Sequence, residues 1–317
     1  MSEYKDKVVL ITGGTGSIGS EIVRQLLETD AAQIRIFSRD EHKQHELRQA
    51  LGSDARLRYL IGDIRDRDRL DYAFRGVDIC FHAAALKHVP ICEYNPFEAV
   101  KTNVVGTQNI IDVAIKHNLE KVVAVSTDKA VAPESVLGAS KLMMERLIIA
   151  ANITTGPSRT RFSCVRFGNV LESRGSVIHL WRKQIEQGKP VTVTDREATR
   201  FFMEVPDAVK LIFDAGRLMR GGEIFVLKMP KRSIAEFAQE TIQKYANGAK
   251  VEISFIGMRP GEKLHEALLT QEEEARTLET DGLFIVLPED FLHGTDPLEA
   301  HTYQGARKAN GEGYVLR

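Results

Sequence analysis

The sequence has few cysteines, no long apolar run and almost no net charge, and each shortage excludes a class of protein. Its 317 residues include three cysteines without CxxC spacing, which excludes a disulfide framework and favours a reducing compartment. Its 43 Lys and Arg nearly balance its 44 Asp and Glu, to a net charge of −1. No global basic field therefore exists to hold a nucleic-acid backbone, although a local anion site is compatible with this composition.

From the sequence we also expect neither a membrane span nor a secretory signal. No stretch approaches the roughly 18 continuous apolar residues of a span, and residues 1–7 are polar, unlike a signal peptide. Hydrophobic residues make up 43% and charged residues 27% of the chain, which is typical of a globular protein with a sizeable core. We therefore expect a soluble, cytoplasmic protein with one large domain or two smaller ones.

The first half of the chain alternates short apolar runs with longer segments of helical spacing. The runs are rich in β-branched residues and apolar on successive positions, as in strands buried on both faces of a parallel sheet. We expect strands at 8–12, 34–38, 57–61, 77–82, 122–126 and 162–166. We expect helices at 17–28, 41–51, 68–74, 97–117 and about 138–151. This alternation predicts an α/β fold with a doubly wound parallel sheet of the Rossmann type.

The pattern changes after residue 166, and this change divides the chain. We assign residues 1–166 to a dinucleotide-binding Rossmann domain that also carries the catalytic residues. Shorter segments and two clusters of Gly, Pro and charge, at 196–206 and 257–263, follow. We expect residues 167–292 to form mainly a smaller substrate-binding lobe, with some elements returning to the main sheet. Residues 293–317 are polar and weakly periodic, and we assign them no function.

A glycine-rich loop joins the first expected strand to the first expected helix. Its glycines allow a tight turn, close approach of a pyrophosphate and close packing of the helix. The helix that follows directs unpaired N–H groups and its positive dipole end at the phosphates. A purely structural turn is the alternative, but the strand–loop–helix context favours a dinucleotide site. We expect cofactor contacts from Gly13, Thr15, Gly16, Ser17, Ile18 and Gly19.

The end of the second strand indicates which dinucleotide binds. Ser38 and Arg39 stand where a carboxylate usually binds the adenosine ribose of NAD, and Lys43 follows one turn later. A hydroxyl and a cation at this place favour the 2′-phosphate of NADP, while Asp40 keeps NAD as the alternative. Further cofactor contacts are expected after the third and fourth strands, at Asp63, Ile64, Ala83 and Ala84.

Motifs along residues 5–270 resemble a known enzyme family. The sequence Ser126-Thr-Asp-Lys129 follows the fifth strand, at the edge where open α/β sheets bind ligands. With Lys141 it resembles the extended short-chain dehydrogenase/reductase superfamily, which uses a Ser/Thr and a YxxxK element. The further motifs are Ala85-Leu-Lys-His-Val-Pro90, Glu93-Tyr-Asn-Pro96, Arg166-Phe-Gly-Asn169, Ser173-Arg-Gly-Ser-Val177 and Arg259-Pro-Gly-Glu-Lys263. Together they resemble the CapD-like nucleotide-sugar 4,6-dehydratases that act on UDP-N-acetylglucosamine.

The resemblance implies a cofactor-recycling dehydration. Hydride leaves C4 for the nicotinamide, Lys129 removes the C5 proton, and protonated Asp128 donates to the departing C6 hydroxyl. The hydride then adds at C6. For this role we expect burial to keep part of Lys129 neutral. Thr127 is expected to bond the C4 hydroxyl, and Lys141 the nicotinamide ribose.

One position departs from the family pattern. The tyrosine of YxxxK is replaced by Leu137, which cannot exchange a proton with a sugar hydroxyl. The C5-inverting branch keeps this tyrosine and the C5-retaining branch typically has methionine, so Leu137 favours retention. Asp128 as a carboxylate, or water held by Thr127, are the candidates to accept the C4 hydroxyl proton. An inverting dehydratase, a UDP-hexose 4-epimerase, an inactive homologue and a non-catalytic NADP sensor are the alternatives.

Cations in the second half are expected to bind the two phosphates of a UDP-sugar, since forked guanidinium groups fit phosphate oxygens. Asn169 is expected at the sugar or its phosphate, Glu262 at the uridine ribose and Lys87 near the sugar, whereas His88 is given no catalytic role. The expected substrate residues are Lys87, Asn169, Arg174, Val177, Arg200, Arg259 and Glu262. No metal site is expected. The resemblance also implies a homo-oligomer.

Overall fold

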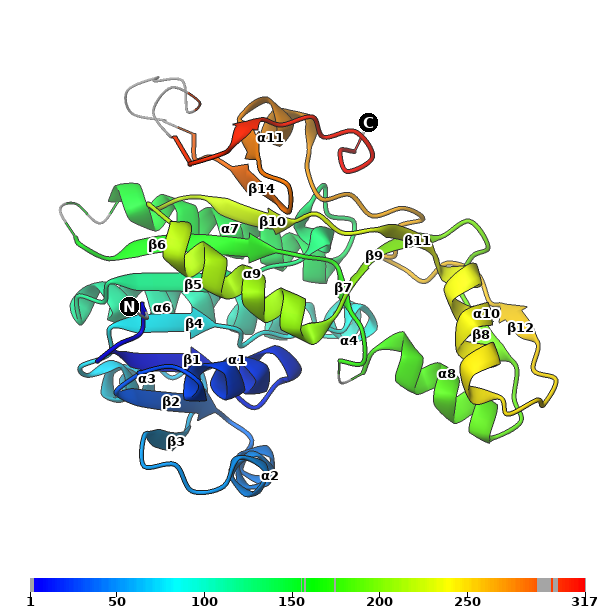
Figure 1. Cartoon of the computed structure of the whole chain (residues 1–317), viewed down its shortest axis with the longest axis horizontal. Coiled ribbons are helices and arrows are strands. Elements are labelled where there is room, and N and C mark those ends of the chain that lie inside the picture. The colour runs from blue at the N-terminus through cyan, green and yellow to red at the C-terminus, as the bar shows by residue number, and fades with distance from the viewer. Residues whose placement is uncertain are drawn as a thin grey trace.

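Figure 1 shows a computed structural model of the chain, which describes residues 3–154, 156, 158–173, 175–289, 298 and 302–316. In this part of the chain ten strands form one sheet, in the order β15-β13-β14-β10-β6-β5-β4-β1-β2-β3. The parallel strands are β1 (Val8–Thr12), β2 (Gln33–Ser38), β3 (Leu57–Ile61), β4 (Ile79–His82), β5 (Lys121–Val125), β6 (Arg161–Arg166) and β10 (Ile224–Leu227). The antiparallel edge strands are β14 (Leu283–Val286), β13 (Thr277–Glu279) and β15 (Arg307–Lys308).

Helices cover both faces of this sheet, which confirms the doubly wound α/β fold. Figure 1 shows α1 (Ser17–Leu27) and α9 (Val205–Leu218) on one face. On the other face lie α3 (Arg67–Phe74), α6 (Gly106–Lys116) and α7 (Val136–Thr154). The strands between them are apolar on successive residues because both of their faces are buried. No helix in the described ranges combines the length and the apolar character needed to cross a membrane.

The segment expected as one helix at 97–117 is divided into three elements. These are α5 (Pro96–Ala99), the π-helical η1 (Val100–Val105) and α6. The wider π turn buries Asn103, which accepts a hydrogen bond from Leu86 N and donates one to Leu86 O. Tertiary hydrogen bonding therefore changes a helix that helical spacing alone predicts as regular.

A smaller group of helices and strands, separate from the main sheet, lies beyond the carboxyl ends of the parallel strands (Figure 1). Its helices are α8 (Val177–Glu186) and α10 (Ile234–Tyr245). Its strands are β7 (Asn169–Val170), β9 (Thr199–Met203) and β11 (Lys231–Ser233) in one sheet, and β8 (Val191–Val193) and β12 (Ile253–Phe255) in another. Trp181 is fully buried in a separate core, 5.7 Å from the Phe237 ring. We call this group the small lobe.

After β6 the chain passes several times between the small lobe and the main sheet, because β10, β13, β14 and β15 return to the sheet. β15 lies within the segment 293–317, part of which is outside the described residues. The limits set at 166 and 292 stay predictions.

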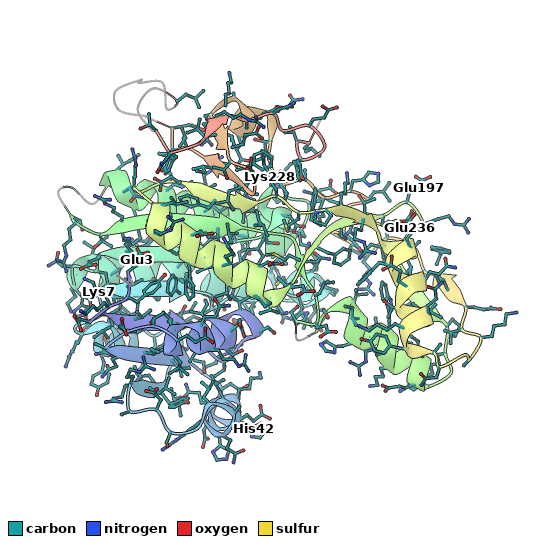
Figure 2. All side chains as sticks on the ribbon, viewed as in Figure 1. Glu3, Lys7, His42, Glu197, Lys228 and Glu236 are labelled. Atoms are coloured by element: carbon teal, nitrogen blue, oxygen red, sulfur yellow. The ribbon has the colours of Figure 1, made fainter. Side chains whose placement is uncertain are left out.

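Charged side chains of both signs are spread over the surface, as Figure 2 shows. Lys7 Nζ lies 2.5 Å from Glu120 Oε1, and Lys121 bonds Glu3. These ion pairs join the segment before β1 to the start of β5, at the amino ends of these parallel strands.

Candidate functional site

A cavity of about 990 Å³ lies at the carboxyl ends of the parallel strands, between the main sheet and the small lobe. Every described residue that the sequence predicts for the site lines this cavity, except Asp128. Asp128 is fully buried beside it. Arg174 lies outside the described residues. Among the described residues, no cluster of three or more His, Cys, Asp or Glu side chains could hold a metal ion.

The glycine-rich loop between β1 and α1 forms one end of the cavity. Gly13 has a φ of 67°, and a Cβ there would lie 2.7 Å from the Ala84 nitrogen. A Cβ on Gly19 would collide with the Gly13 carbonyl. Helix α1 begins after Gly16, and no side chain caps its first turn. The glycines therefore let a ligand approach the backbone at the start of α1 closely, which fits a dinucleotide pyrophosphate.

Side chains after β2 form the edge where an adenosine ribose would lie. Asp40 caps α2 (Glu41–Leu51), accepting from Lys43 N at 3.0 Å, and its carboxylate lies 2.7 Å from Lys43 Nζ. The Arg39 side chain is 59% exposed, 3.7 Å from Asp63. Ser38 is buried, and its hydroxyl accepts from Gln44. The Asp40 carboxylate is thus bound to Lys43 and to the start of α2, while Arg39 lines the cavity with an exposed guanidinium.

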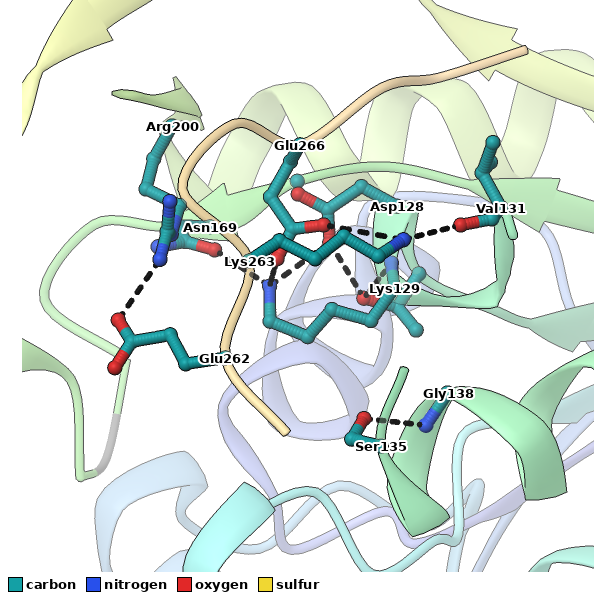
Figure 3. Close-up of polar contacts among 12 residues, drawn as sticks. Asp128, Lys129, Val131, Ser135, Gly138, Asn169, Arg200, Glu262, Lys263 and Glu266 are labelled. Atoms are coloured by element: carbon teal, nitrogen blue, oxygen red, sulfur yellow. Dashed lines mark hydrogen bonds and ion pairs between the residues drawn. The ribbon is translucent and has the colours of Figure 1, made fainter. Parts of the chain in front are cut away.

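The predicted catalytic residues lie directly after β5. Thr127 precedes the short helix η2 (Asp128–Ala130) and donates to Asp128 Oδ1 at 2.9 Å. Lys129 Nζ donates to the same oxygen at 3.0 Å and to Asn169 Oδ1 at 3.3 Å. A Cβ on Gly138 would collide with the Lys129 carbonyl, so the glycine lets α7 pack against η2. These contacts hold the amine at the cavity wall (Figure 3).

Glu266 also faces this amine, and the sequence did not predict it as a site residue. Its Oε1 lies 3.4 Å from Lys129 Nζ, and its side chain is only 2% exposed. Its one sequence signal is its place three residues after the charged cluster that ends at Lys263. The ion pair depends on a contact between segments more than 130 residues apart, which no local pattern reveals.

The charge state of Lys129 differs from the expectation. Burial disfavours its charged form, but the carboxylates of Asp128 and Glu266 outweigh burial and hold the pKa of Lys129 above the ordinary lysine value. The expected lowering of this pKa is therefore wrong for the protein without substrate. Burial also raises the pKa of Glu266, against the attraction of Lys129, and Asp128 adds to the increase.

Two residues of α7 complete the wall. Leu137 is 3% exposed and packs in a small apolar cluster with Cys92 and Ala99. It brings no titratable group to the cavity. Lys141 Nζ donates to the Val125 carbonyl at 2.7 Å, and burial lowers the pKa of Lys141 to about 8.

The predicted substrate residues meet at the small-lobe side of the cavity. Arg200 Nη2 donates to Glu262 Oε1 at 2.8 Å, so these residues bind each other in the protein without substrate. Arg259 and Val177 line the same wall, and burial lowers the pKa of Lys87. The described residues thus place cations and a carboxamide around the same cavity that the glycine-rich loop lines.

Comparisons with known families and proteins agree with this arrangement. The family model described as polysaccharide biosynthesis protein matches residues 9–288. A UDP-N-acetylglucosamine 4,6-dehydratase (inverting) of Campylobacter jejuni is 43% identical, over 90% of this chain and 84% of that protein. A UDP-glucose 4-epimerase of Rickettsia canadensis is 45% identical, with the same coverage. An uncharacterized membrane protein of Methanocaldococcus jannaschii is 52% identical, over 90% of this chain and 87% of that protein.

Solved structures show the same fold. Pen from Bacillus thuringiensis superposes with a TM-score of 0.92 at 41% identity, covering 98% of this chain and 93% of that one. The dTDP-glucose 4,6-dehydratase DesIV from Streptomyces venezuelae, solved with NAD and TYD bound, gives a TM-score of 0.75 at 26% identity. That match covers 82% of this chain and 87% of the other.

Proposed function

Because the chain belongs to the polysaccharide biosynthesis protein family, we propose that it is a nucleotide-sugar 4,6-dehydratase, a lyase that removes water from UDP-N-acetylglucosamine. The observation that carries this proposal is the Thr127, Asp128 and Lys129 group at the end of β5, next to a dinucleotide-type loop. The 43% identity to a dehydratase of this substrate supports it.

The reaction requires an acid and a base around the sugar. A nicotinamide dinucleotide held at the glycine-rich loop would supply the hydride acceptor for C4 and the hydride donor for C6. The C5 proton becomes acidic once C4 is a ketone, and Lys129 is then the base that removes it. Asp128 gives a proton to the C6 hydroxyl as it leaves. Thr127 orients the C4 hydroxyl, whose proton passes to the Asp128 carboxylate or to water held by Thr127.

We also propose that C5 keeps its configuration. Inversion needs proton donors on both faces of the ring, whereas retention needs only one group that takes and returns the proton. Leu137 puts an apolar side chain where a phenol would supply a second such group. The expected product is UDP-2-acetamido-2,6-dideoxy-α-D-xylo-hexos-4-ulose.

Incubation with UDP-N-acetylglucosamine, followed by mass spectrometry and proton NMR, tests both the proposed dehydration and the proposed C5 configuration. We expect loss of one water, and the proton NMR coupling constants of the sugar whose C5 configuration is retained. An early L-arabino product would show inversion, as in the name of the Campylobacter relatives. An unchanged mass with a new stereoisomer would favour the epimerase, the name of the Rickettsia relatives. Unchanged substrate would favour a dinucleotide sensor or an inactive homologue.

For the cofactor we propose NADP, because Arg39 is exposed at the ribose edge while Asp40 is bound to Lys43 and to the start of α2. We expect NADP(H) in nucleotide extracted from the purified protein. We expect Arg39→Ala to weaken NADP binding about tenfold or more relative to NAD, by loss of a charge-assisted phosphate contact. Recovery of NAD alone, the ligand of the DesIV structure, would contradict this assignment.

The cytoplasmic location and the homo-oligomer that the family resemblance implies stay proposals. So do the roles of the lining residues in substrate binding.

A further inference from the structure

The Lys129 amine is held between two carboxyl groups that come from different parts of the chain. Asp128 is its neighbour in η2, and Glu266 comes from the loop between β12 and α11 (Gln271–Ala275). Figure 3 shows Asp128, Glu266 and Asn169 converging on the amine. Glu266 lines the cavity, whereas Asp128 does not.

The two carboxyl groups differ in their access to the cavity, which Glu266 lines and Asp128 does not. Asp128 Oδ1 accepts hydrogen bonds from both Thr127 and Lys129. Asp128 Oδ2 and Glu266 Oε2 are both buried, and neither has a hydrogen-bond partner among the described residues. Both carboxyl groups therefore have an oxygen available to carry a proton, but Glu266 is the one that lines the cavity, where the sugar would cover it.

The other charges around this pair are cations. Lys263 Nζ lies 4.0 Å from Glu266 Oε2 and donates to the Val131 carbonyl. The charge of Arg200, on β9, lowers the pKa of both Lys129 and Glu266. Its guanidinium is bound to Glu262. Both cations help to keep Glu266 ionised while the cavity is open to water.

A charged Lys129 cannot remove a proton from C5. A proton must first leave the amine, and Glu266 is the cavity-lining carboxyl group beside it. We propose that Glu266 accepts this proton when the sugar covers the site, which leaves Lys129 as a neutral base. One N–H bond of Lys129 breaks and one O–H bond forms on Glu266, so a buried ion pair becomes two neutral groups. Exclusion of water favours the neutral pair, since buried charges are costly.

The inference rests on the proposed dehydratase function, and Glu266 is a positioning residue because it acts through Lys129. The test compares the pH dependence of kcat in the wild type and in Glu266→Gln, which keeps the shape of the side chain. Wild-type kcat is expected to stay level from about pH 7 to about pH 9, because the pair holds its one proton throughout this range. In Glu266→Gln the proton must leave to water, so kcat is expected to rise about tenfold per pH unit.

Glu272→Gln is the matched control, because Glu272 is exposed and lies six residues further along. In Glu272→Gln, kcat should stay level over the same pH range as in the wild type. Parallel pH profiles in the wild type and Glu266→Gln would overturn the inference and leave the dehydratase standing. A wild type that removes no water from UDP-N-acetylglucosamine would overturn the proposed function, and with it the need for a C5 base.

A second measurement needs no turnover. Trace acetic anhydride labels neutral amines, and mass spectrometry of the peptide that contains Lys129 gives the labelling rate. Loss of the Glu266 charge should lower the pKa of Lys129, so Glu266→Gln is expected to label faster than the wild type at the same pH. Equal rates would overturn the inference whatever the substrate, because they would show that Glu266 does not act on the amine.

Discussion

Replacing Lys129 by alanine is expected to lower kcat for dehydration by about 10²- to 10⁴-fold, the usual contribution of a general base. The amine lies at the cavity wall between Asp128, Asn169 and Glu266, and no other described lysine contacts this group of side chains as closely as Lys129. Cofactor binding should be retained when turnover stops, because Lys129 is not part of the glycine-rich loop that is proposed to hold the dinucleotide. The measurement is the rate of water loss by mass spectrometry, beside bound nucleotide after extraction.

A charge-only role for Lys129 predicts a different outcome with arginine. Lys129→Arg keeps the positive charge between two buried carboxylates, so the fold keeps its counter-ion, but a guanidinium cannot give up its proton. If Lys129 is the C5 base, the arginine variant should be as inactive as the alanine variant. If the arginine variant stays within about tenfold of the wild type, the amine serves only as a charge. Thermal unfolding of both variants separates lost chemistry from lost structure.

The parts of the fold that the sequence predicted are those determined by local patterns. Apolar runs on successive residues are buried strands here, and the strand of residues 8–12 is β1 with unchanged bounds. The glycine-rich loop was predictable because Gly13 and Gly19 lie where any Cβ would collide with backbone. Their position directly after β5, at the carboxyl edge of the sheet, likewise predicted that Thr127 and Lys129 lie at the cavity.

The contacts that the sequence did not predict join distant segments. Helix α4 (Val89–Tyr94) is too short for helical spacing to show, and Pro90 stands at its start. The pairing of Arg200 with Glu262 and the approach of Glu266 to Lys129 depend on how the loop after β12 returns to the main sheet. The pKa of Lys129 also depends on these distant contacts, because the carboxylate of Glu266 helps to outweigh burial. The predicted lowering of this pKa was wrong for that reason.

Arg166 shows a further difference between motif and structure, and it carries the largest expected effect on stability. The resemblance places Arg166 in a family motif, yet its side chain is fully buried and is absent from the cavity wall. Its guanidinium donates to both oxygens of Glu145, on α7, and both oxygens of Glu273, on α11, at 2.7–3.1 Å. It also bonds the Leu268 carbonyl at 2.8 Å.

Arg166→Met is expected to lower the free energy of unfolding by about 3–5 kcal/mol at neutral pH, because it leaves two buried carboxylates without a partner. Denaturant unfolding followed by tryptophan fluorescence or circular dichroism measures this loss. A loss below about 1 kcal/mol would mean that water or other donors already satisfy Glu145 and Glu273.

The pH dependence separates stranded charge from lost packing. Burial alone would raise the pKa of Glu273, but the bonds from Arg166 outweigh it and lower that pKa to about 2. In the wild type this contribution to stability is therefore present above the ordinary glutamate pKa of 4.5 and is lost as the pH falls toward about 2.

In Arg166→Met the stranded carboxyls take up protons at a higher pH, so the difference in stability from the wild type should shrink between about pH 7 and about pH 5. Adding Glu145→Gln and Glu273→Gln removes both charges, and glutamine at 273 can keep the hydrogen bond from Thr270 N that starts α11. The triple variant should recover part of the lost stability at pH 7 and show no such pH dependence. A deficit that stays constant with pH in both variants would mean that the volume of the Arg166 side chain, and not its charge, holds α7, β6 and α11 together.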